Sequence, residues 1–374
     1  MSPFHDSRDP ESGVGNWLLR HHLDPWLLLF LLALSGLGTM VLYSATGQDA
    51  AALTSQMQRL ALGLVVMFIA AQAPPEVYRA AAPWFFGVAT ILLIAVLLLG
   101  DSSKGARRWL DLGVVRFQPS EMMKLAMPMM VAAFLHSTGV PPRFSGLLIV
   151  LAIIGVPTLM VARQPDLGTS LLVLAAGGFA LYLGGLRWRW ILAAIGAMPV
   201  AAYLVWQRMH EYQKQRVMTF LDPASDPLGS GYHITQSKIA IGSGGTFGKG
   251  WLNGTQANLD FLPESHTDFI FAVFAEETGI IGVVCLLLLY IAIVLRGMVI
   301  ALRAQDTFQR LLAGSLSLTF FLYVFINIGM VIGLLPVVGV PLPLVSYGGT
   351  SMVSLLAGFG MLMSIQTHRK LLSS

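Results

Sequence analysis

Long apolar stretches separated by shorter polar ones are the dominant pattern along this chain of 374 residues. An α-helix needs about 20 mostly apolar residues to cross the hydrocarbon core of a bilayer. Windows that meet this requirement predict about ten spanning helices. They cover residues 26–45, 57–73, 78–99, 119–136, 145–162, 167–185, 188–207, 268–295, 309–333 and 347–366. The expected fold is therefore an all-α integral membrane protein.

The polar segments around these windows define the expected domain organisation. A polar N-terminal tail covers residues 1–25, a polytopic membrane domain covers 26–366, and a short tail follows at 367–374. One long polar segment, 208–267, separates the seventh and eighth predicted helices. Loops of this length on a compact protein are usually functional, so we expect this segment to contribute to the site.

Composition supports the membrane assignment. The chain is 55% hydrophobic and 11% charged, with a mean hydropathy of +0.71. Soluble domains carry about 25% charged residues, so this chain has too little polar surface to cover itself in water. Its single cysteine, Cys285, excludes an internal disulfide and cannot form a metal site alone.

The positions of Lys and Arg predict the orientation, because short cytoplasmic loops are enriched in both. With the N-terminus inside, the cytoplasmic segments contain Arg8, Arg20, Arg79, Arg143, Arg187, Arg189, Arg296, Arg303, Arg310, Arg369 and Lys370. The short loop 46–56 and the stretch 334–346 contain neither residue type. Both tails are therefore expected in the cytoplasm, and segment 208–267 on the extracytoplasmic face.

Another set of basic residues falls on the outer face in this orientation. These are Lys104, Arg107, Arg108, Arg116, Arg163, Arg208, Lys214, Arg216, Lys238 and Lys249. One explanation is that longer outer loops tolerate charge, since the rule applies to short loops. The other is that the protein handles an anion on its outer face, and charge alone leaves both open.

Asp268 stands where the outer segment enters the eighth predicted helix. A carboxylate at a membrane boundary is a candidate general base. Ser265 and Asp268 are also spaced as a capping box at a helix start, which is the structural alternative. Glu276 and Glu277 follow about 12 Å deeper in the same helix, where ionisable groups normally face a polar cavity or a partner.

The fourth predicted helix contains two opposite charges, Glu121 and Lys124. Their i, i+3 spacing places them on one face, where they can neutralise each other. The pair is either structural or part of a substrate cavity. Arg116 and Asp166 both stand at the outer boundary, and an arginine there could hold an oxyanion through two hydrogen bonds. Each could equally be a residue of the rim.

Two segments have unusual backbone composition. The glycine-rich string IGSGGTFGKG, residues 241–250, has Phe247 where a dinucleotide-binding loop needs glycine, and it does not match a P-loop. We expect a tightly turned loop that approaches another segment closely. The stretch GLLPVVGVPLPLVSYGG, residues 333–349, is uncharged and interrupted by prolines. Irregular backbone at membrane depth must be buried in protein or line a cavity, which predicts a re-entrant loop.

Long strings of the sequence resemble the shape, elongation, division and sporulation (SEDS) family of cell-wall polymerases. The likeness covers nearly the whole chain, and within the family it is greatest to the elongation member. The strings are HLDPWLLL, YSATGQD, KGARRWLDLGVVRFQPSEMMKLA, QPDLGTS, QRVMTFLDPASDPLGSGYHITQSKIAIGSGG, GKGWLNGTQ, LPESHTDFIFAVFAEETG, NIGMVIGLLPVVGVPLPLVSYGGTSM and THRK. Thr350, where Ser is common, keeps the hydroxyl group.

The resemblance implies ten transmembrane helices and a peptidoglycan glycosyltransferase. The enzyme would polymerise lipid II on the outer face of the cytoplasmic membrane during cell elongation and rod-shape maintenance. By similarity, Asp268 is catalytic, and Glu121 with Lys124, Arg116 and Asp166 match the family's other motif positions. Lys238 is a further candidate for stabilising the leaving diphosphate.

The resemblance also implies partners. Lipid II and the growing glycan strand are the substrates, a class B penicillin-binding protein would supply transpeptidation, and other membrane proteins of the elongation complex would join them. The sequence has no nucleic-acid motif and requires no cofactor, although a divalent cation at the diphosphate is compatible with it. The alternatives are a lipid II flippase and a non-catalytic scaffold for a transpeptidase.

Overall fold

Helices make up most of the computed structural model, which describes residues 13–99, 101–103, 106–111, 116–209, 211–222, 230–255 and 265–369. The first helices are α1 (Gly13–Arg20), α2 (Pro25–Ala45), α3 (Ala50–Gln72), α4 (Pro75–Leu99), α5 (Pro119–Thr138), α6 (Phe144–Arg163), α7 (Leu167–Leu183) and α8 (Trp188–Arg208). The later helices are α9 (Glu211–Leu221), α10 (Ser230–Gly244), α12 (Ile270–Leu302), α13 (Thr307–Val331) and α14 (Thr350–Thr367).

A helix lies at the position of every predicted span, which confirms the all-α membrane fold. Of the described helices, 8 are long and apolar enough to cross a membrane, and α7 is a shorter apolar helix. The exact number of spans stays a prediction, because α5 falls outside both groups. This helix carries Glu121 and Lys124 and packs among α4, α6, α7 and α13. It therefore needs little lipid-facing apolar surface.

Some predicted helix boundaries were wrong. The second helix begins at Ala50 instead of 57, because Asp49 caps it by accepting from the Ala51 amide at 2.8 Å. The helix predicted over 268–295 begins at Ile270 and continues to Leu302. Both changes lengthen helices beyond their apolar windows, since helix ends are set by capping as well as by hydropathy.

A small antiparallel sheet, which the sequence did not predict, lies in the connection between α4 and α5. Its strands are β1 (Asp101–Ser103), β2 (Ala106–Asp111) and β3 (Arg116–Phe117), paired in the order β1-β2-β3. These strands are too short for an alternating pattern to be recognised. The sheet leads the chain directly into α5, so it sets where that helix begins.

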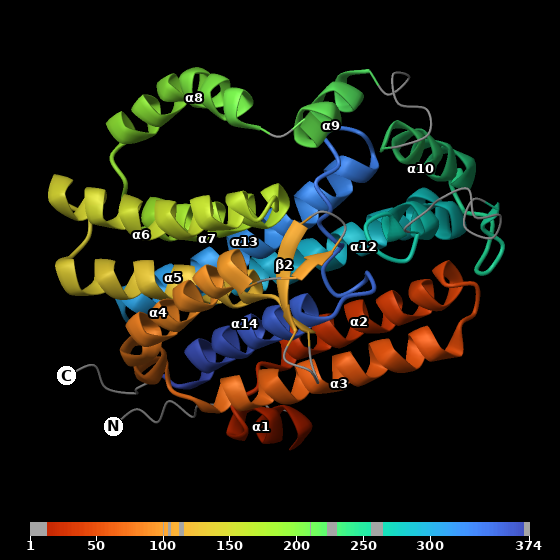
Figure 1. Ribbon diagram of the computed structural model, residues 1–374. Helices are drawn as coiled ribbons and strands as arrows, with labels where there is room; N and C mark the ends of the chain where they lie inside the picture. The colour runs from red at the N-terminus through yellow and green to blue at the C-terminus, as the bar shows by residue number, and fades with distance from the viewer. Residues whose placement is uncertain are drawn as a thin grey trace.

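Helix α13 lies at the centre of the bundle, packed against α5, α7 and α12 (Figure 1). Helix α14 packs along α3, and α2 packs along α12. Small residues allow the close approaches, as they commonly do in membrane bundles. Gly360 of α14 is an example, since a Cβ atom there would collide with the carbonyl oxygen of Met67.

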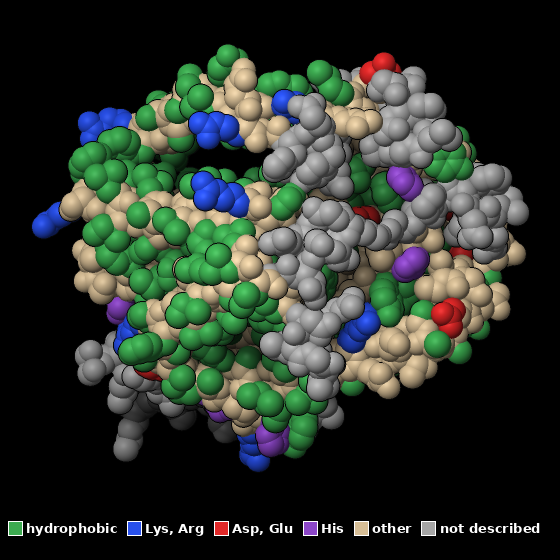
Figure 2. Space-filling view, in the orientation of Figure 1, with side chains coloured by type: hydrophobic (Ala, Val, Ile, Leu, Met, Phe, Trp, Pro, Cys, Tyr) green, Lys and Arg blue, Asp and Glu red, His purple; other side chains and the backbone are tan. Residues whose placement is uncertain are grey.

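Helix α8 stands apart from this bundle (Figure 1). None of its described side chains is buried. Trp190 in its first turn stacks on Phe144, with the ring centres 5.5 Å apart. Figure 2 shows a hollow between α8 and the neighbouring helices, and hydrophobic side chains cover much of this face. The hollow therefore opens toward the side of the bundle that lipid would surround.

The long polar segment 208–267 is not a plain loop in its described part. It contains α9 and α10, and α10 packs against α12. The Ser237 hydroxyl donates to the carbonyl of Val331 at 2.7 Å, which ties α10 to the end of α13. The segment thus supports the end of the bundle where α12 begins, called here the Asp268 end. The opposite end, where α2 begins and α14 ends, is called the terminal end.

Candidate active site

The segment between α13 and α14, residues 332–349, forms no helix or strand and is called here the re-entrant segment. Its residues Val340, Leu342 and Val345 are buried. A Cβ atom at Gly38, seven residues before the end of α2, would collide with the carbonyl oxygen of Leu344. That places the segment about 10 Å below the end of α2. The segment is therefore buried in the protein, as its irregular composition predicted, and its entry into the membrane from the outer face stays a prediction.

Asp268 lies in the turn 265–269 just before α12, and its side chain is half-buried. The cap of α12 is Phe269, without a side-chain hydrogen bond. The Ser265 hydroxyl instead donates to the carbonyl of Ala45 at 3.1 Å, which anchors the turn to the end of α2. The capping-box alternative for Ser265 and Asp268 was therefore wrong, because the helix begins one turn later than the spacing suggested.

Asn327 on α13 connects Asp268 to the re-entrant segment. Its side-chain amide donates to the carbonyl of Asp268 at 2.9 Å and to the carbonyl of Val340 at 2.7 Å. Next to Val340, Gly339 has a φ of +72°. A Cβ atom there would lie 3.5 Å from Asp268 Oδ2, so the carboxylate lies directly over this glycine. Asn327 was not among the predicted site residues, although an amide inside an apolar span is a signal of function.

Asp166 caps α7 and is nearly fully buried. Its Oδ1 accepts from the amide of Thr169 at 3.2 Å, and its Oδ2 accepts from the side chain of Gln118, also at 3.2 Å. One turn of α7 rests on the re-entrant segment, since a Cβ atom at Gly168 would lie 2.9 Å from the carbonyl oxygen of Val338. The elements that carry Asp166 and Asp268 therefore contact the same part of this segment, residues 338–340.

Glu121 and Lys124 form a buried ion pair, as their spacing predicted. Their side chains are 2.8 Å apart and only 6% and 7% exposed. Ser354 of α14 donates to Oε2 of the same Glu121 carboxylate at 2.8 Å. The Lys124 ammonium also lies 4.7 Å from the centre of the Tyr323 ring on α13, within the range of a cation–π interaction.

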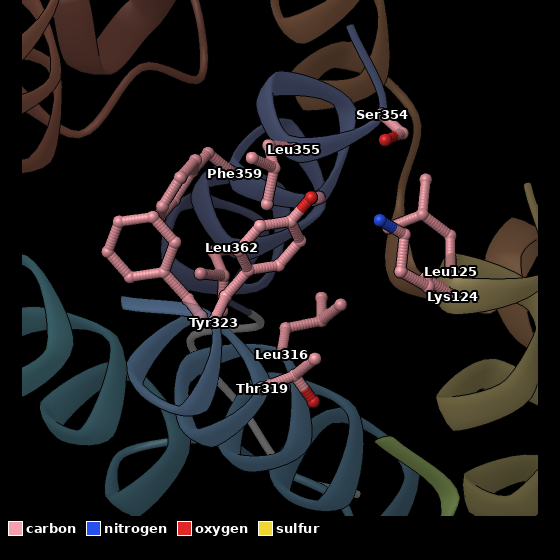
Figure 3. A pocket seen from close by; sticks show the side chains of 11 residues that line it. Lys124, Leu125, Leu316, Thr319, Tyr323, Ser354, Leu355, Phe359 and Leu362 are labelled. Atoms are coloured by element: carbon pink, nitrogen blue, oxygen red, sulfur yellow. The ribbon is translucent and has the colours of Figure 1, made fainter. Parts of the chain in front are cut away.

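A cavity of about 40 Å³ opens beside this ion pair between α5, α13 and α14 (Figure 3). Lys124, Tyr323 and Ser354 provide its polar wall, and the remaining lining is mostly apolar. A second, smaller cavity shares Tyr323 and Leu355 and is lined by residues 341–344 of the re-entrant segment. The ion pair and the re-entrant segment are therefore neighbours across a small open space.

The two basic residues predicted for the site, Arg116 and Lys238, lie on different elements. Arg116 lies in β3, where its backbone pairs with Asp111, and its side chain falls outside the described residues. It precedes by two residues the Gln118 that contacts Asp166. Lys238 is exposed on α10, and a Cβ atom at Gly333 would lie 2.7 Å from its Nζ. Lys238 therefore contacts the start of the re-entrant segment.

Arg59 is a further basic residue at this end, and it was not among the predicted site residues. Its guanidinium lies 4.4 Å from the centre of the Tyr347 ring. The Tyr347 amide donates to the carbonyl of His266 at 2.9 Å, so Arg59 is connected to the turn that carries Asp268. An arginine inside a predicted span was the available signal.

Glu276 is fully buried and does not contact the ion pair of α5. It accepts from the Lys249 ammonium at 2.6 Å and from the Thr255 amide at 2.9 Å. The glycine-rich segment lies directly on α12 at this point. A Cβ atom at Gly248 would collide with the carbonyl oxygen of Glu277, and one at Gly279 would collide with the amide nitrogen of Gly248. The prediction of a closely approaching loop is confirmed, and Lys249 of the outer basic set has a partner within the protein.

These features define a polytopic membrane protein with clustered carboxylate, amide and basic groups at one end of its bundle. The model of the cell cycle proteins FtsW, RodA and SpoVE matches residues 24–371. The chain belongs to this family.

Relatives and solved structures agree with the family assignment. The chain is 58% identical over 353 residues to the peptidoglycan glycosyltransferase MrdB of Escherichia coli K12, covering 94% of this chain and 95% of that protein. It is similar to a chain of a peptidoglycan synthase complex that coordinates polymerization and crosslinking, with a TM-score of 0.82 and 32% identity, covering 93% of this chain and 99% of that one. The Thermus thermophilus rod shape determining protein RodA matches with a TM-score of 0.71 and 29% identity, covering 93% and 98%.

Proposed function

We propose that this protein is a peptidoglycan glycosyltransferase that polymerises lipid II into glycan strands, and that Asp268 is its general base. The observation that carries the proposal is the placement of Asp268 over Gly339, with its main chain held by Asn327. This arrangement fixes a half-buried carboxylate against a shaped, irregular segment. The name of the E. coli relative supports the same activity.

The proposed reaction is a single displacement. Asp268 takes the proton from the 4-hydroxyl of the acceptor GlcNAc, and the hydroxyl oxygen forms a bond to C1 of the donor MurNAc. The bond from C1 to the diphosphate oxygen breaks, and undecaprenyl diphosphate departs with the electron pair. A diphosphate needs little protonation to leave, so a second carboxylic acid of the glycosidase kind is not required.

Stabilising the leaving diphosphate would fall to basic groups at the same end. Arg116 and Lys238 are the groups that the sequence suggested, and Arg59 is added by its contact with Tyr347. An arginine can hold two phosphate oxygens at once. Electrostatic stabilisation of developing charge is often the largest contribution to catalysis of this kind. No cofactor is required, and a divalent cation bound with the diphosphate is compatible with this arrangement.

The lipid part of the substrate needs an apolar approach to this site. The hollow beside α8 supports entry from the side, because none of the described side chains of this helix is buried. We place the protein in the cytoplasmic (inner) membrane with its Asp268 end outside and both tails in the cytoplasm. Its partners would be a class B penicillin-binding protein and other membrane proteins of the elongation complex.

The alternatives predict different products from the same reconstituted system. Purified protein is placed in liposomes with lipid II, with and without a purified transpeptidase, and both glycan strands and lipid II translocation are measured. We expect strands from lipid II supplied on the side of Asp268. Translocation without polymer would support the flippase instead. Polymer absent under all conditions, with normal binding of the transpeptidase, would support the scaffold.

A further inference from the structure

A cluster of basic side chains lies at the terminal end of the bundle, far from the proposed active site. At its centre, Arg296 of α12 binds both carboxylate oxygens of Asp24, with Nε 3.1 Å from Oδ1. Asp24 is 1% exposed and also caps α2. Arg303 stands seven residues after Arg296 at the end of α12, which places both arginines on one face of that helix. Both oxygens of the Asp24 carboxylate are thus already bound by Arg296.

The end of α14 brings further basic groups to the same place. His368 stacks on His22, with ring centres 3.8 Å apart and planes only 7° from parallel. The next residue, Arg369, is exposed and donates to the side chain of Gln366 at 2.7 Å, a neutral partner. Because His22 precedes Asp24 by two residues, the stack places the end of α14 beside the Asp24–Arg296 pair. Burial and then the charges of Arg303 and Arg296 lower the pKa of Arg369, in agreement with this placement.

The charges in this cluster do not balance among the described residues. Arg296, Arg303 and Arg369 supply three positive charges against the single negative charge of Asp24. Asp306, three residues after Arg303, is paired with a further cation, Arg79, at 3.7 Å, and so does not change this balance. A simpler explanation is that these arginines only complement helix C-termini. Two such termini, of α12 and α14, are together equivalent to about one negative charge. About one positive charge is then left over, which is the charge that one phosphate diester would neutralise.

The position of the cluster identifies the source of such a phosphate. Trp17 and Trp26 lie at the same end and are 55% and 60% exposed. Exposed tryptophans at the ends of spanning helices mark the headgroup level of a bilayer. Arg303 and Arg369 are both exposed at that level. We propose that Arg303 and Arg369 form a binding site for the phosphate of an anionic phospholipid, held at the terminal end of the bundle.

The test is the stabilisation of the purified full-length protein by phosphatidylglycerol in zwitterionic detergent. Ligand that binds the folded state raises the melting temperature as its concentration passes the Kd. The double variant Arg303→Gln/Arg369→Gln is compared with Arg187→Gln/Arg189→Gln, which removes two exposed arginines at the start of α8. Phosphatidylcholine and inorganic phosphate serve as the other ligands. Arg296 is left unchanged, so its pair with Asp24 stays intact.

We expect the apparent Kd for phosphatidylglycerol to rise at least about fivefold in the Arg303/Arg369 variant and less than about twofold in the α8 variant. Phosphatidylcholine and inorganic phosphate should stabilise neither protein at the same concentrations. Equal losses in both variants, or no loss in either, would overturn the proposal. So would equal stabilisation by inorganic phosphate, because the site would then take a free anion. If the double variant melts early without lipid, Arg303→Lys/Arg369→Lys should fold and retain binding, and its failure to bind overturns the site.

Discussion

Asn327 lies at the centre of the bundle, and its side-chain amide donates to the main-chain carbonyl of Asp268 over a distance of 2.9 Å. The same amide group holds the carbonyl of Val340, 2.7 Å away, in the re-entrant segment. One fully buried side chain on α13 therefore fixes the distance between the proposed base and the backbone that it faces. Positioning of this kind matters because a displacement of about 1 Å can cost a factor of about 100 in rate.

Replacing Asn327 with leucine should lower the polymerisation rate by roughly 100-fold. Leucine has a similar size but cannot donate, so both carbonyls lose their partner. Turnover should fall more than the apparent affinity for lipid II. The matched control is Ser315→Ala on the same helix, whose hydroxyl donates to the carbonyl of Ala176 at 2.6 Å. If both variants lose the same activity, Asn327 contributes only stability.

The ion pair of Glu121 and Lys124 should show strong coupling. Lys124→Met leaves the Glu121 carboxylate buried without its partner, which typically costs about 3–5 kcal/mol. The double variant Glu121→Gln/Lys124→Met should recover most of that loss, as measured by the melting temperature in detergent. We expect the double variant to stay inactive, because Lys124 lines the cavity next to the re-entrant segment. Recovery of polymerisation would show that the pair is purely structural.

The glycine-rich segment offers a matched pair of substitutions. Gly248→Ala should destabilise the protein strongly, because its Cβ would collide with the carbonyl oxygen of Glu277 and its φ is +79°. Gly242→Ala lies in α10 with nothing within 4 Å and should be neutral or stabilising by about 0.5–1 kcal/mol. The melting temperatures of the two variants, each compared with that of the wild type, test both expectations. Equal effects would mean that the segment does not rest on α12.

His22 should make stability depend on pH. Burial, followed by the charges of His368 and His21, lowers the pKa of His22 below its usual value of 6.5. The folded protein then binds this proton more weakly than the unfolded chain, so the free energy of unfolding should fall as the pH drops through 6.5. His22→Asn, which tolerates the φ of +56° at this position, should reduce that fall. An unchanged slope between about pH 5 and pH 8 would contradict the assignment.

Hydropathy was enough to find the long apolar helices of this fold, because a spanning helix must be apolar over a fixed length. The shorter helices α1, α9 and α10 fall outside the apolar windows and were not predicted. The helix ends were harder to predict, as the early start of α3 at its Asp49 cap shows. The β1–β3 sheet was missed because three short strands leave no periodic pattern. Capping and short-strand pairing depend on local contacts that hydropathy does not record.

The candidate site was only partly predictable for the same reason. Glu121 and Lys124 are three residues apart in one helix, so their contact follows from helical geometry alone. The contact between Asp268 and Asn327 joins residues 59 positions apart, and the one between Arg59 and Tyr347 joins α3 to the re-entrant segment. Such contacts depend on tertiary packing, and no spacing in the sequence shows them.

The most direct test of the account is glycan-strand synthesis from purified lipid II by the wild type and the Asp268→Asn variant, each with a purified transpeptidase partner. Asparagine keeps the size of the side chain but cannot act as a base. We predict strands with the wild type and none with Asp268→Asn at equal protein level and melting temperature. Equal polymerisation by the variant would contradict the account, and the base would then have to be sought at Asp166 or Glu276.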